Sequence, residues 1–376
     1  ECPYHGWQFD AKGKTTKIPQ APNQGVCDKA APARGFPTHV TGDIVWAYLP
    51  TEPRPTGDEN MFRGLPSRDD LWMQAALARD HPDQAREAAM LHATTSTYVR
   101  ELPYSWDYLL ENGMDPAHVP FAHVAFQGAR SDGEPVPMKV LEKDDRTFHV
   151  RAYTKKGDVQ REAFHFFEMP SHFWIKMREK DSGEPAKMMT YVLSLPVGPG
   201  RSRVLIPTLS TSPLIMRKMP AWVAHIFTNK FVDADAWLQY AERRVAAGNR
   251  YVSMTTSDVG PDQFRAWWRE NWKGRPLFGD NEERLKRRGS APKQPKEQYL
   301  SWYESHVKNC HTCYSVLRRA EKVKKLSLLL ALAPITLGMS WHYRVGGLAL
   351  MLAARFGSEK IIEMMGPGHH AEPSVA

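Results

Sequence analysis

Two histidines five positions apart, His118 and His123, place the strongest constraint on the fold of this chain. Pro120 lies between them, so we expect one helical stretch over residues 104–126 that breaks near this proline. The break can turn both imidazoles toward one metal ion. A distant carboxylate would complete a site of two histidines and one carboxylate, which has open positions and suits non-haem Fe(II) and O₂. The alternative is a pair of helix histidines with ordinary polar partners.

A second candidate metal-binding pair, Cys2 and His5, lies at the start of the sequence. A thiolate and an imidazole three positions apart on a tight turn can bind one metal from one loop. The spacing alone is a weak signal, because most such pairs are unrelated surface or core residues. The sequence begins with Glu1 rather than methionine. We therefore expect a fragment whose N-terminus, with further ligands, lies upstream.

The rest of the chain has the composition of an ordinary globular protein, with 376 residues of which 42% are hydrophobic and 24% charged. Short apolar runs between turn residues predict a β-rich unit over residues 1–50, and the stretch 51–85, rich in Pro, Gly, Arg and Asp, predicts a linker. We expect strands over residues 147–153 and 189–195, helices over 214–250 and 261–272, and a loop over 273–296. The predicted fold class is therefore mixed α+β.

The C-terminal part differs from the rest in hydropathy. Residues 326–343 are an 18-residue run without Asp, Glu, Lys or Arg, and residues 345–354 extend it after Arg344. A membrane-crossing helix needs roughly 20 apolar residues, so the first run is marginal, and the alternative is a buried core helix followed by an amphipathic one. Five basic residues directly precede the run: Arg318, Arg319, Lys322, Lys324 and Lys325. With a net charge of +8, this cluster favours an anionic membrane surface as partner over nucleic acid.

Cys310 and Cys313 form a C-x2-C motif just before these basic residues. Alone, the motif predicts either a redox-active dithiol or half of a zinc site. The sequence has no second C-x2-C, so a four-cysteine zinc site would need a partner chain. His306 and His311 are further candidate ligands, although a local zinc loop of that spacing would be unusual. We favour the redox role, with a buried pair of reduced cysteines as the alternative.

Several segments together resemble one protein family. Residues 2–10, with Gly13 and residues 18–20 after them, resemble the second half of the Rieske iron–sulfur motif, whose first half is an upstream C-x-H pair. Residues 112–123 resemble the N-x2-D-x2-H-x4-H mononuclear-iron motif of Rieske oxygenases. Residues 99–104, 255–258 and 264–267, and the C-x2-C before apolar segments, resemble the plastid branch of pheophorbide a oxygenase and chlorophyllide a oxygenase.

The resemblance implies two iron centres. Cys2 and His5 would supply two of the four ligands of a Rieske [2Fe-2S] cluster. His118 and His123 would bind the mononuclear Fe(II), together with an aspartate on a late helix.

For that aspartate the candidates are Asp235 and Asp233. They lie on opposite flanks of the apolar face predicted for this helix, formed by Ala234, Leu238, Ala241 and Val245. We favour Asp235, which lies slightly nearer this face, and keep Asp233 as the alternative. The resemblance also implies that Asp115 hydrogen-bonds an iron-ligand histidine and a Rieske histidine of a neighbouring subunit, although Asp115 could simply cap the helix before Pro116. Asn112 is expected near the same site, without an assigned role.

The activity implied by the resemblance is a Rieske monooxygenase that uses O₂ and electrons from ferredoxin to oxygenate a pheophorbide-like tetrapyrrole. A homotrimer in a chloroplast membrane, either thylakoid or inner envelope, and thioredoxin control of Cys310 and Cys313 are implied as well. Substrate would bind in a helix-grip (START-like) domain, in a pocket lined by some of its aromatic residues, most of which could equally be plain strand core: Phe164, Phe166, Phe167, Phe173 and Trp174. The alternatives are a plastid-envelope redox or regulatory protein and a sterol or aromatic Rieske oxygenase.

These expectations divide the chain into six parts. Residues 1–55 are the C-terminal half of a Rieske domain, 56–90 a linker and 91–300 the catalytic domain. The C-x2-C segment follows over residues 301–325. A transmembrane hairpin is predicted over 326–356, and residues 357–376 form the tail.

Overall fold

The computed structural model of the chain consists of two compact units, Glu1–His92 and Ala93–Ala376, which we describe separately. The structure describes residues 1–33, 35–36, 38–41, 44–47, 97–124, 128–145, 147–169, 171–184, 186–207, 218–243, 252–272, 300–336, 338 and 340–367. The linker predicted over 51–85 and the loop predicted over 273–296 lie outside these residues.

The first unit is built from short strands, as the sequence predicts. Strand β1 (Gln8–Phe9) pairs with β2 (Thr15–Lys17), and β3 (Thr38–Thr41) pairs with β4 (Ile44–Ala47), both antiparallel. A 3₁₀ helix, η1 (Gln24–Lys29), lies between the two pairs and buries Cys27. The β-rich character expected for residues 1–50 is confirmed.

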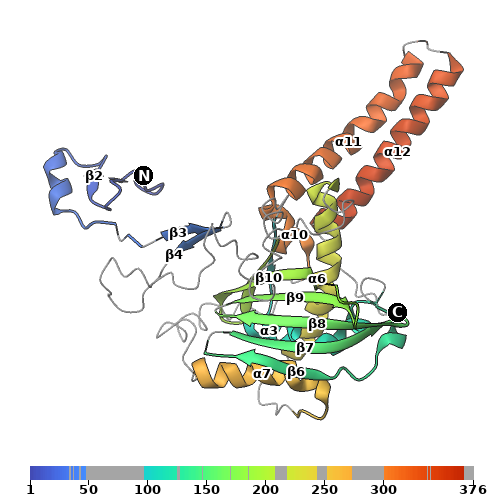
Figure 1. Cartoon of the computed structure of the whole chain (residues 1–376). Helices are drawn as coiled ribbons and strands as arrows, with labels where there is room; N and C mark the ends of the chain where they lie inside the picture. Colours follow the sequence, from blue (N-terminus) through green and yellow to red (C-terminus); the bar gives the residue numbers. More distant parts are fainter. Residues whose placement is uncertain are drawn as a thin grey trace. The chain divides into compact units, whose positions relative to one another are not determined.

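The second unit contains a seven-stranded antiparallel sheet with the order β5-β11-β10-β9-β8-β7-β6 (Figure 1). Its strands are β5 (Thr97–Leu102), β6 (Met138–Lys143), β7 (Thr147–Lys156), β8 (Val159–Glu168), β9 (His172–Glu179), β10 (Lys187–Gly198) and β11 (Arg201–Pro207). The two strands expected from the sequence lie within β7 and β10, and the mixed α+β class is confirmed. The six strands from β6 to β11 follow one another as hairpins, and β5, which comes earlier in the chain, pairs with β11 at one edge of the sheet.

Helices pack on the sheet through alternate residues of its strands. They are α3 (Trp106–Gly113), α6 (Ala221–Arg243) and α7 (Val259–Trp267), which continues as a π-helical turn, Trp268–Trp272. Phe167 of β8 contacts Phe264 and Trp267 of α7, with ring centroids 5.4 and 4.6 Å apart. Gly260 allows α7 to approach α3 closely, because a methyl group there would lie 2.1 Å from the carbonyl oxygen of Met114. This contact holds the C-terminal end of α3 in place.

The chain ends in a helical hairpin. After α10 (Trp302–Ser305) and η10 (Val307–Asn309), helices α11 (His311–Thr336) and α12 (Trp341–Met365) run side by side (Figure 1). The base of the hairpin packs on α6 through a cluster that includes Ile226, Leu317 and Met365. The apolar run 326–343 is therefore not one helix, because it is divided at the turn around Gly338, whose φ is +65°. Among the described residues, no helix is long and apolar enough to cross a membrane.

Candidate functional site: a two-histidine, one-carboxylate centre

A cavity of about 610 Å³ lies inside the second unit. Its walls come from α3, the segment after α3, strands of the sheet and α6. Five residues expected at or near the mononuclear iron site line it: Asn112, Asp115, His118, His123 and Asp235. The volume is within the range of small-molecule sites, roughly 300–1,000 Å³.

The helical stretch expected over residues 104–126 breaks earlier than predicted. Helix α3 ends at Gly113, and a 3₁₀ turn, η5 (Pro116–His118), leads into the short α4 (Val119–Ala122). The break falls at Asp115, whose φ of −109° and ψ of 91° are extended, as the residue before a proline prefers. Pro120 lies in the first turn of α4, where a proline is tolerated, so it breaks nothing.

This irregular path brings His118 and His123 together. Residues five apart on a continuous α-helix point about 140° away from each other. Here the two ring centroids are 5.3 Å apart. The Nε2 atoms of His118 and His123 lie 3.6 and 3.3 Å from the same carboxylate oxygen, Oδ1 of Asp235.

Neighbouring groups hold each imidazole in position. Nδ1 of His118 makes a short hydrogen bond with the carbonyl oxygen of Asp115. Because a carbonyl only accepts, Nδ1 carries the proton and Nε2 keeps its lone pair for a metal. The ring of His123 stacks on Phe231 with centroids 4.0 Å apart and planes 8° apart. Phe231 and Asp235 are one turn apart on α6, so one helix face both supports His123 and supplies the carboxylate.

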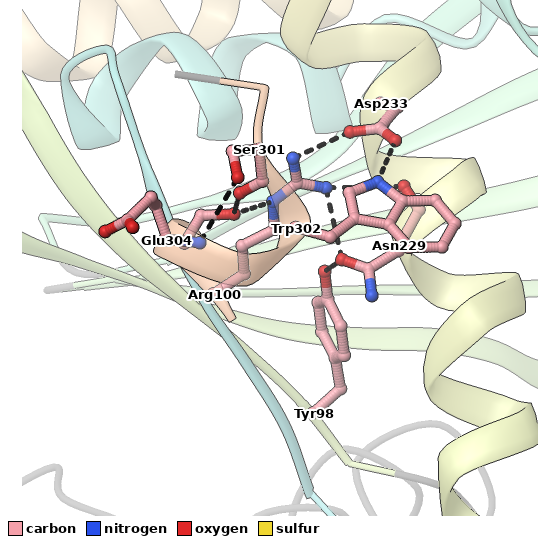
Figure 2. Close-up of polar contacts among 8 residues, drawn as sticks. Tyr98, Arg100, Asn229, Asp233, Ser301, Trp302 and Glu304 are labelled. Atoms are coloured by element: carbon pink, nitrogen blue, oxygen red, sulfur yellow. Dashed lines mark hydrogen bonds and ion pairs between the residues drawn. The ribbon is translucent and has the colours of Figure 1, made fainter. Parts of the chain in front are cut away.

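Asp233 has different partners. Its Oδ1 lies 2.7 Å from Nη2 of Arg100, and its Oδ2 accepts a hydrogen bond from Nε1 of Trp302, as Figure 2 shows. Arg100 also contacts Asn229, which accepts a hydrogen bond from the Tyr98 hydroxyl at 2.6 Å. This buried network anchors α6 to β5 and α10 on the side away from the histidines.

Of the apolar face predicted for α6, only Ala234 has a described side chain, and it is half-buried. The side chains of Leu238, Ala241 and Val245 lie outside the described residues, so the rest of this face stays a prediction. In the described part, α6 buries Val232 and Ala236 and also both aspartates, Asp233 held by an ion pair and Asp235 facing two histidines.

The three side chains of the second unit are suited to a metal ion. One ligand atom from each of His118, His123 and Asp235 lies within 4.8 Å of the others. Oδ1 of Asp235 is buried and has no hydrogen-bond partner in the described part of the chain, although it faces two imidazole nitrogens. A carboxylate oxygen in this position is stabilised by a cation between it and the nitrogens. Two histidines and one carboxylate are the donor set of non-haem Fe(II) sites.

Asp115 holds the backbone of the turn that carries His118. Its Oδ1 accepts a hydrogen bond of 2.9 Å from the Ala117 amide and so caps η5. Burial raises the pKa of the Asp115 carboxyl. The cap fixes the carbonyl group that orients His118.

Replacing Asp115 with alanine is expected to lower Fe(II) affinity about 10- to 100-fold, the usual effect of losing a group that orients a ligand. Asp115→Asn is the matched control, because asparagine caps a helix as well as aspartate does and should keep affinity near the wild-type value. Anaerobic titration of the metal-free proteins with Fe(II) measures the affinity of each variant. Equal affinity in the alanine variant and wild type would contradict the positioning role.

Two polar residues of the cavity were not predicted. Tyr104 and His165 are buried, line the cavity, and present an Oη and an Nε2 without a partner in the described residues. Nδ1 of His165 lies 2.9 Å from the carbonyl oxygen of Gly113, and burial lowers the pKa of His165 to about 4. Its Nε2 is therefore an acceptor facing the cavity. Tyr104 lies at the start of the predicted helical stretch and His165 in apolar strand-like sequence, so no local pattern marked either as a site residue.

Most of the aromatic residues predicted to line the cavity lie elsewhere. Of the five, Phe173 lines it. Phe167 packs on α7, and Phe166 stacks on Trp174 with centroids 5.2 Å apart. Alternation along β8 and β9 puts Phe164, Phe166 and Trp174 on the opposite face of the sheet. Phe167 is on the cavity face but is covered by α7.

Cys2 and His5 lie on a tight turn in the first unit. The Cys2 amide donates to the Trp7 carbonyl at 2.7 Å, and the Gly6 amide donates to the Cys2 carbonyl at 2.8 Å. Gly6 has a φ of +74°, a conformation that favours glycine. The Gln20 side chain donates to the His5 carbonyl at 2.8 Å. The turn presents two side chains on one loop, half of the four ligands that a [2Fe-2S] cluster needs.

Comparison with known proteins matches both units. Residues 1–37 match the Rieske [2Fe-2S] domain, and residues 167–250 match the pheophorbide a oxygenase family. Protochlorophyllide-dependent translocon component 52 of Arabidopsis thaliana is 24% identical over 83% of this chain and 61% of that protein. Protein TIC 55 of the same plant is 25% identical over 97% of this chain and 71% of its own length.

Pheophorbide a oxygenase of Oryza sativa subsp. japonica is 25% identical over 86% of this chain and 63% of its own length. All three relatives are chloroplastic proteins. The chain spans about two thirds of the length of these relatives. These matches support a Rieske oxygenase that is similar to pheophorbide a oxygenase and chlorophyllide a oxygenase.

Proposed function

We propose that this chain is the catalytic part of a Rieske monooxygenase, with a mononuclear Fe(II) bound by His118, His123 and Asp235. The observation that carries the proposal is the convergence of these three ligand atoms on the wall of a cavity. Asp233 is not the third ligand in this proposal, because its carboxylate is held by Arg100 and Trp302. We also propose that the sheet and α6 form the helix-grip domain expected for the family.

Bound Fe(II) with open positions would supply the binding and reductive activation of O₂. The protein's own groups have three tasks around it. Phe231 and the carbonyl of Asp115 hold the two imidazoles, so the ligand set is rigid before substrate arrives. Apolar walls exclude water from the cavity. His165 offers an acceptor that can orient a polar group of the substrate.

The cavity suits a large apolar substrate that carries an acidic group. Apolar side chains from several strands line the interior, among them Leu102, Phe173 and Val192. Lys156 and Lys180 also line it and are exposed, so they lie where the cavity meets solvent. A tetrapyrrole with a propionate side chain, such as pheophorbide a, has this chemistry. The family match over residues 167–250 supports the same substrate class.

The electron donor and assembly follow from the family in this proposal. Ferredoxin is an acidic partner, and the net charge of +8 supports its association. A homotrimer in the plastid is proposed on the same basis, supported by the chloroplastic relatives. Cys2 and His5 are two of four cluster ligands, so the chemistry proposed for this chain rests on the mononuclear site alone.

The full-length protein with reduced ferredoxin is expected to consume O₂ when pheophorbide a is added. The methyl ester of the propionate should have a higher KM than the free acid, because it lacks the charge that Lys156 and Lys180 would contact. Oxygen-electrode traces and chromatography of the products measure both. No substrate-dependent O₂ consumption with any tetrapyrrole would favour the plastid redox or regulatory alternative. Turnover of sterols or small aromatic compounds instead would favour the alternative of a sterol or aromatic Rieske oxygenase.

Membrane association through the hairpin is also part of this proposal. Several large hydrophobic side chains on α11 and α12 are about two-thirds exposed, among them Leu329 at 67%, Trp341 at 66% and Leu350 at 63%. Basic residues of α11 precede these exposed apolar residues. An apolar tip with basic flanks favours contact with an anionic lipid surface.

Deleting everything after Lys325 is expected to move the full-length protein from the membrane to the supernatant fraction. Loss of the exposed apolar residues would remove the lipid contact while leaving the cavity residues unchanged. Fractionation with a carbonate wash, followed by iron analysis of the released protein, measures both. A deletion variant that stays with the membranes would place the anchor elsewhere.

A further inference from the structure

Four side chains that can ligate a metal meet in the second unit, and the proposed reaction uses none of them. His225 comes from the first turns of α6, and His306 lies directly after α10. Cys310 and Cys313 lie at the start of α11. One ligand atom from each residue lies within 4.8 Å of the others. His225 is 81 residues or more from the other three in sequence, so the C-x2-C motif alone could not reveal this cluster.

The spacing of the ligand atoms matches that of a tetrahedral site. Nδ1 of His225 lies 3.5 Å from Sγ of Cys310 and 3.4 Å from Sγ of Cys313. Nε2 of His306 lies 3.4 Å from Sγ of Cys313. A tetrahedral Zn²⁺ with its usual bond lengths separates nitrogen and sulfur ligands by about 3.6 Å.

The surroundings hold the ligands ready for a metal. Nδ1 of His306 contacts the Val99 carbonyl oxygen at 2.6 Å, which leaves Nε2 facing the sulfur as a lone-pair donor. The ring of Tyr98 packs against both imidazoles, with centroids 4.6 Å from His306 and 5.6 Å from His225. Both histidines and Cys313 are buried. The two sulfurs lie at the N-terminus of a long helix, where the helix dipole stabilises thiolates.

We propose that His225, His306, Cys310 and Cys313 bind one Zn²⁺ as a structural site. Two sulfur and two nitrogen ligands in a closed tetrahedral set select zinc and leave no position for a substrate. The ion joins α6 to α11 and, through the bond from His306 to Val99, to β5. His225 is ten residues, roughly 15 Å, from Asp235 on the same helix, so the zinc also fixes the helix that carries the iron carboxylate.

A zinc site excludes the simple thiol switch expected from the C-x2-C motif, because both sulfurs are ligands and neither is free to form a disulfide while the ion is bound. No disulfide joins the two cysteines in the structure. His311, which the sequence offered as a further ligand, is exposed and is not part of the cluster. This difference supplies a matched control residue, because His311 lies between the two cysteines.

The test uses the full-length protein and Co²⁺ as the probe, because thiolate-bound tetrahedral Co²⁺ has strong charge-transfer absorption that a histidine–carboxylate site lacks. We expect purified wild-type protein to contain one zinc ion per chain in addition to iron, and Co²⁺ exchange to produce the thiolate band. Cys313→Ser and His225→Ala should lose the band and the zinc. His311→Ala and Cys27→Ser should keep both.

The same experiment separates this site from the iron centre and from a folding defect. His118→Ala should lose iron but keep zinc and the Co²⁺ band, so failure of the iron proposal would leave this one standing. The zinc content of wild-type protein, together with a Co²⁺ band that persists in Cys2→Ser, decides the question even if a variant of the four-residue cluster does not fold. Wild-type protein without zinc and without a thiolate–Co²⁺ band would overturn the proposal. So would a zinc-free protein whose Cys310 and Cys313 form a reversible disulfide.

Discussion

Replacing Asp235 with alanine is expected to abolish mononuclear iron binding and tetrapyrrole oxygenation in the full-length protein while leaving the fold intact. The carboxylate oxygen lies 3.3 Å from Nε2 of His123 and 3.6 Å from Nε2 of His118, and no other described carboxylate joins this group. Two imidazoles alone bind Fe(II) weakly, because they lack the negative charge that the cation needs. Iron analysis and circular dichroism of the purified variant measure the two effects separately.

Asp233→Asn is the comparison variant, because Asp233 is two residues away on the same helix and is also buried. Because the Asp233 carboxylate contacts Arg100 and Trp302 rather than the histidines, folded Asp233→Asn protein should retain its iron. Full iron content in Asp235→Ala, with iron lost from Asp233→Asn, would reverse the assignment of the third ligand.

Breaking the buried ion pair between Arg100 and Asp233 is expected to lower the free energy of unfolding by about 3–5 kcal/mol, since Asp233→Ala leaves a buried guanidinium without its counter-charge. Arg100 is 1% exposed and its Nη2 lies 2.7 Å from the carboxylate (Figure 2). Urea unfolding followed by tryptophan fluorescence measures the change.

The control is an exposed group of ion pairs formed by the next residue of the same strand, Glu101. Glu101 contacts Arg201 and Arg203 on the exposed side of β5, so Glu101→Ala should cost only about 0–1 kcal/mol. The double variant Arg100→Met with Asp233→Leu removes both charges and should recover much of the lost stability. Equal destabilisation by Glu101→Ala and Asp233→Ala would show that burial of the pair has no special effect.

The sequence allowed the class of the fold and the two histidines to be predicted, because both depend on local patterns. The sequences of β7 and β10 either alternate apolar and polar residues or contain apolar runs, and both patterns are typical of strands. The spacing of His118 and His123 around prolines indicated an interrupted helix. The position of the break was wrong, because Pro116 and the extended Asp115 end the helix before Pro120 is reached.

Features that depend on distant contacts could not be predicted. The choice between Asp233 and Asp235 was left almost open by helix periodicity, because it depends on Arg100 and Trp302, more than 60 residues from Asp233 on either side. No sequence motif marks His225 as a metal ligand, and it becomes a candidate only because the fold places it beside Cys310 and Cys313. By contrast, the hairpin predicted over residues 326–356 is present as α11 and α12, whereas no helix among the described residues is long and apolar enough to cross a membrane.

In the proposed function, His118, His123 and Asp235 would hold an iron ion, and this ion would supply the O₂ activation needed to oxygenate a substrate in the cavity. The most direct measurement follows heavy-isotope-labelled O₂ into the tetrapyrrole product by mass spectrometry, using full-length protein and reduced ferredoxin. We expect wild-type protein to place one labelled atom in the product and the double variant His118→Ala with His123→Ala to place none. Unlabelled product from wild type, or equal labelling by the double variant, would contradict the account.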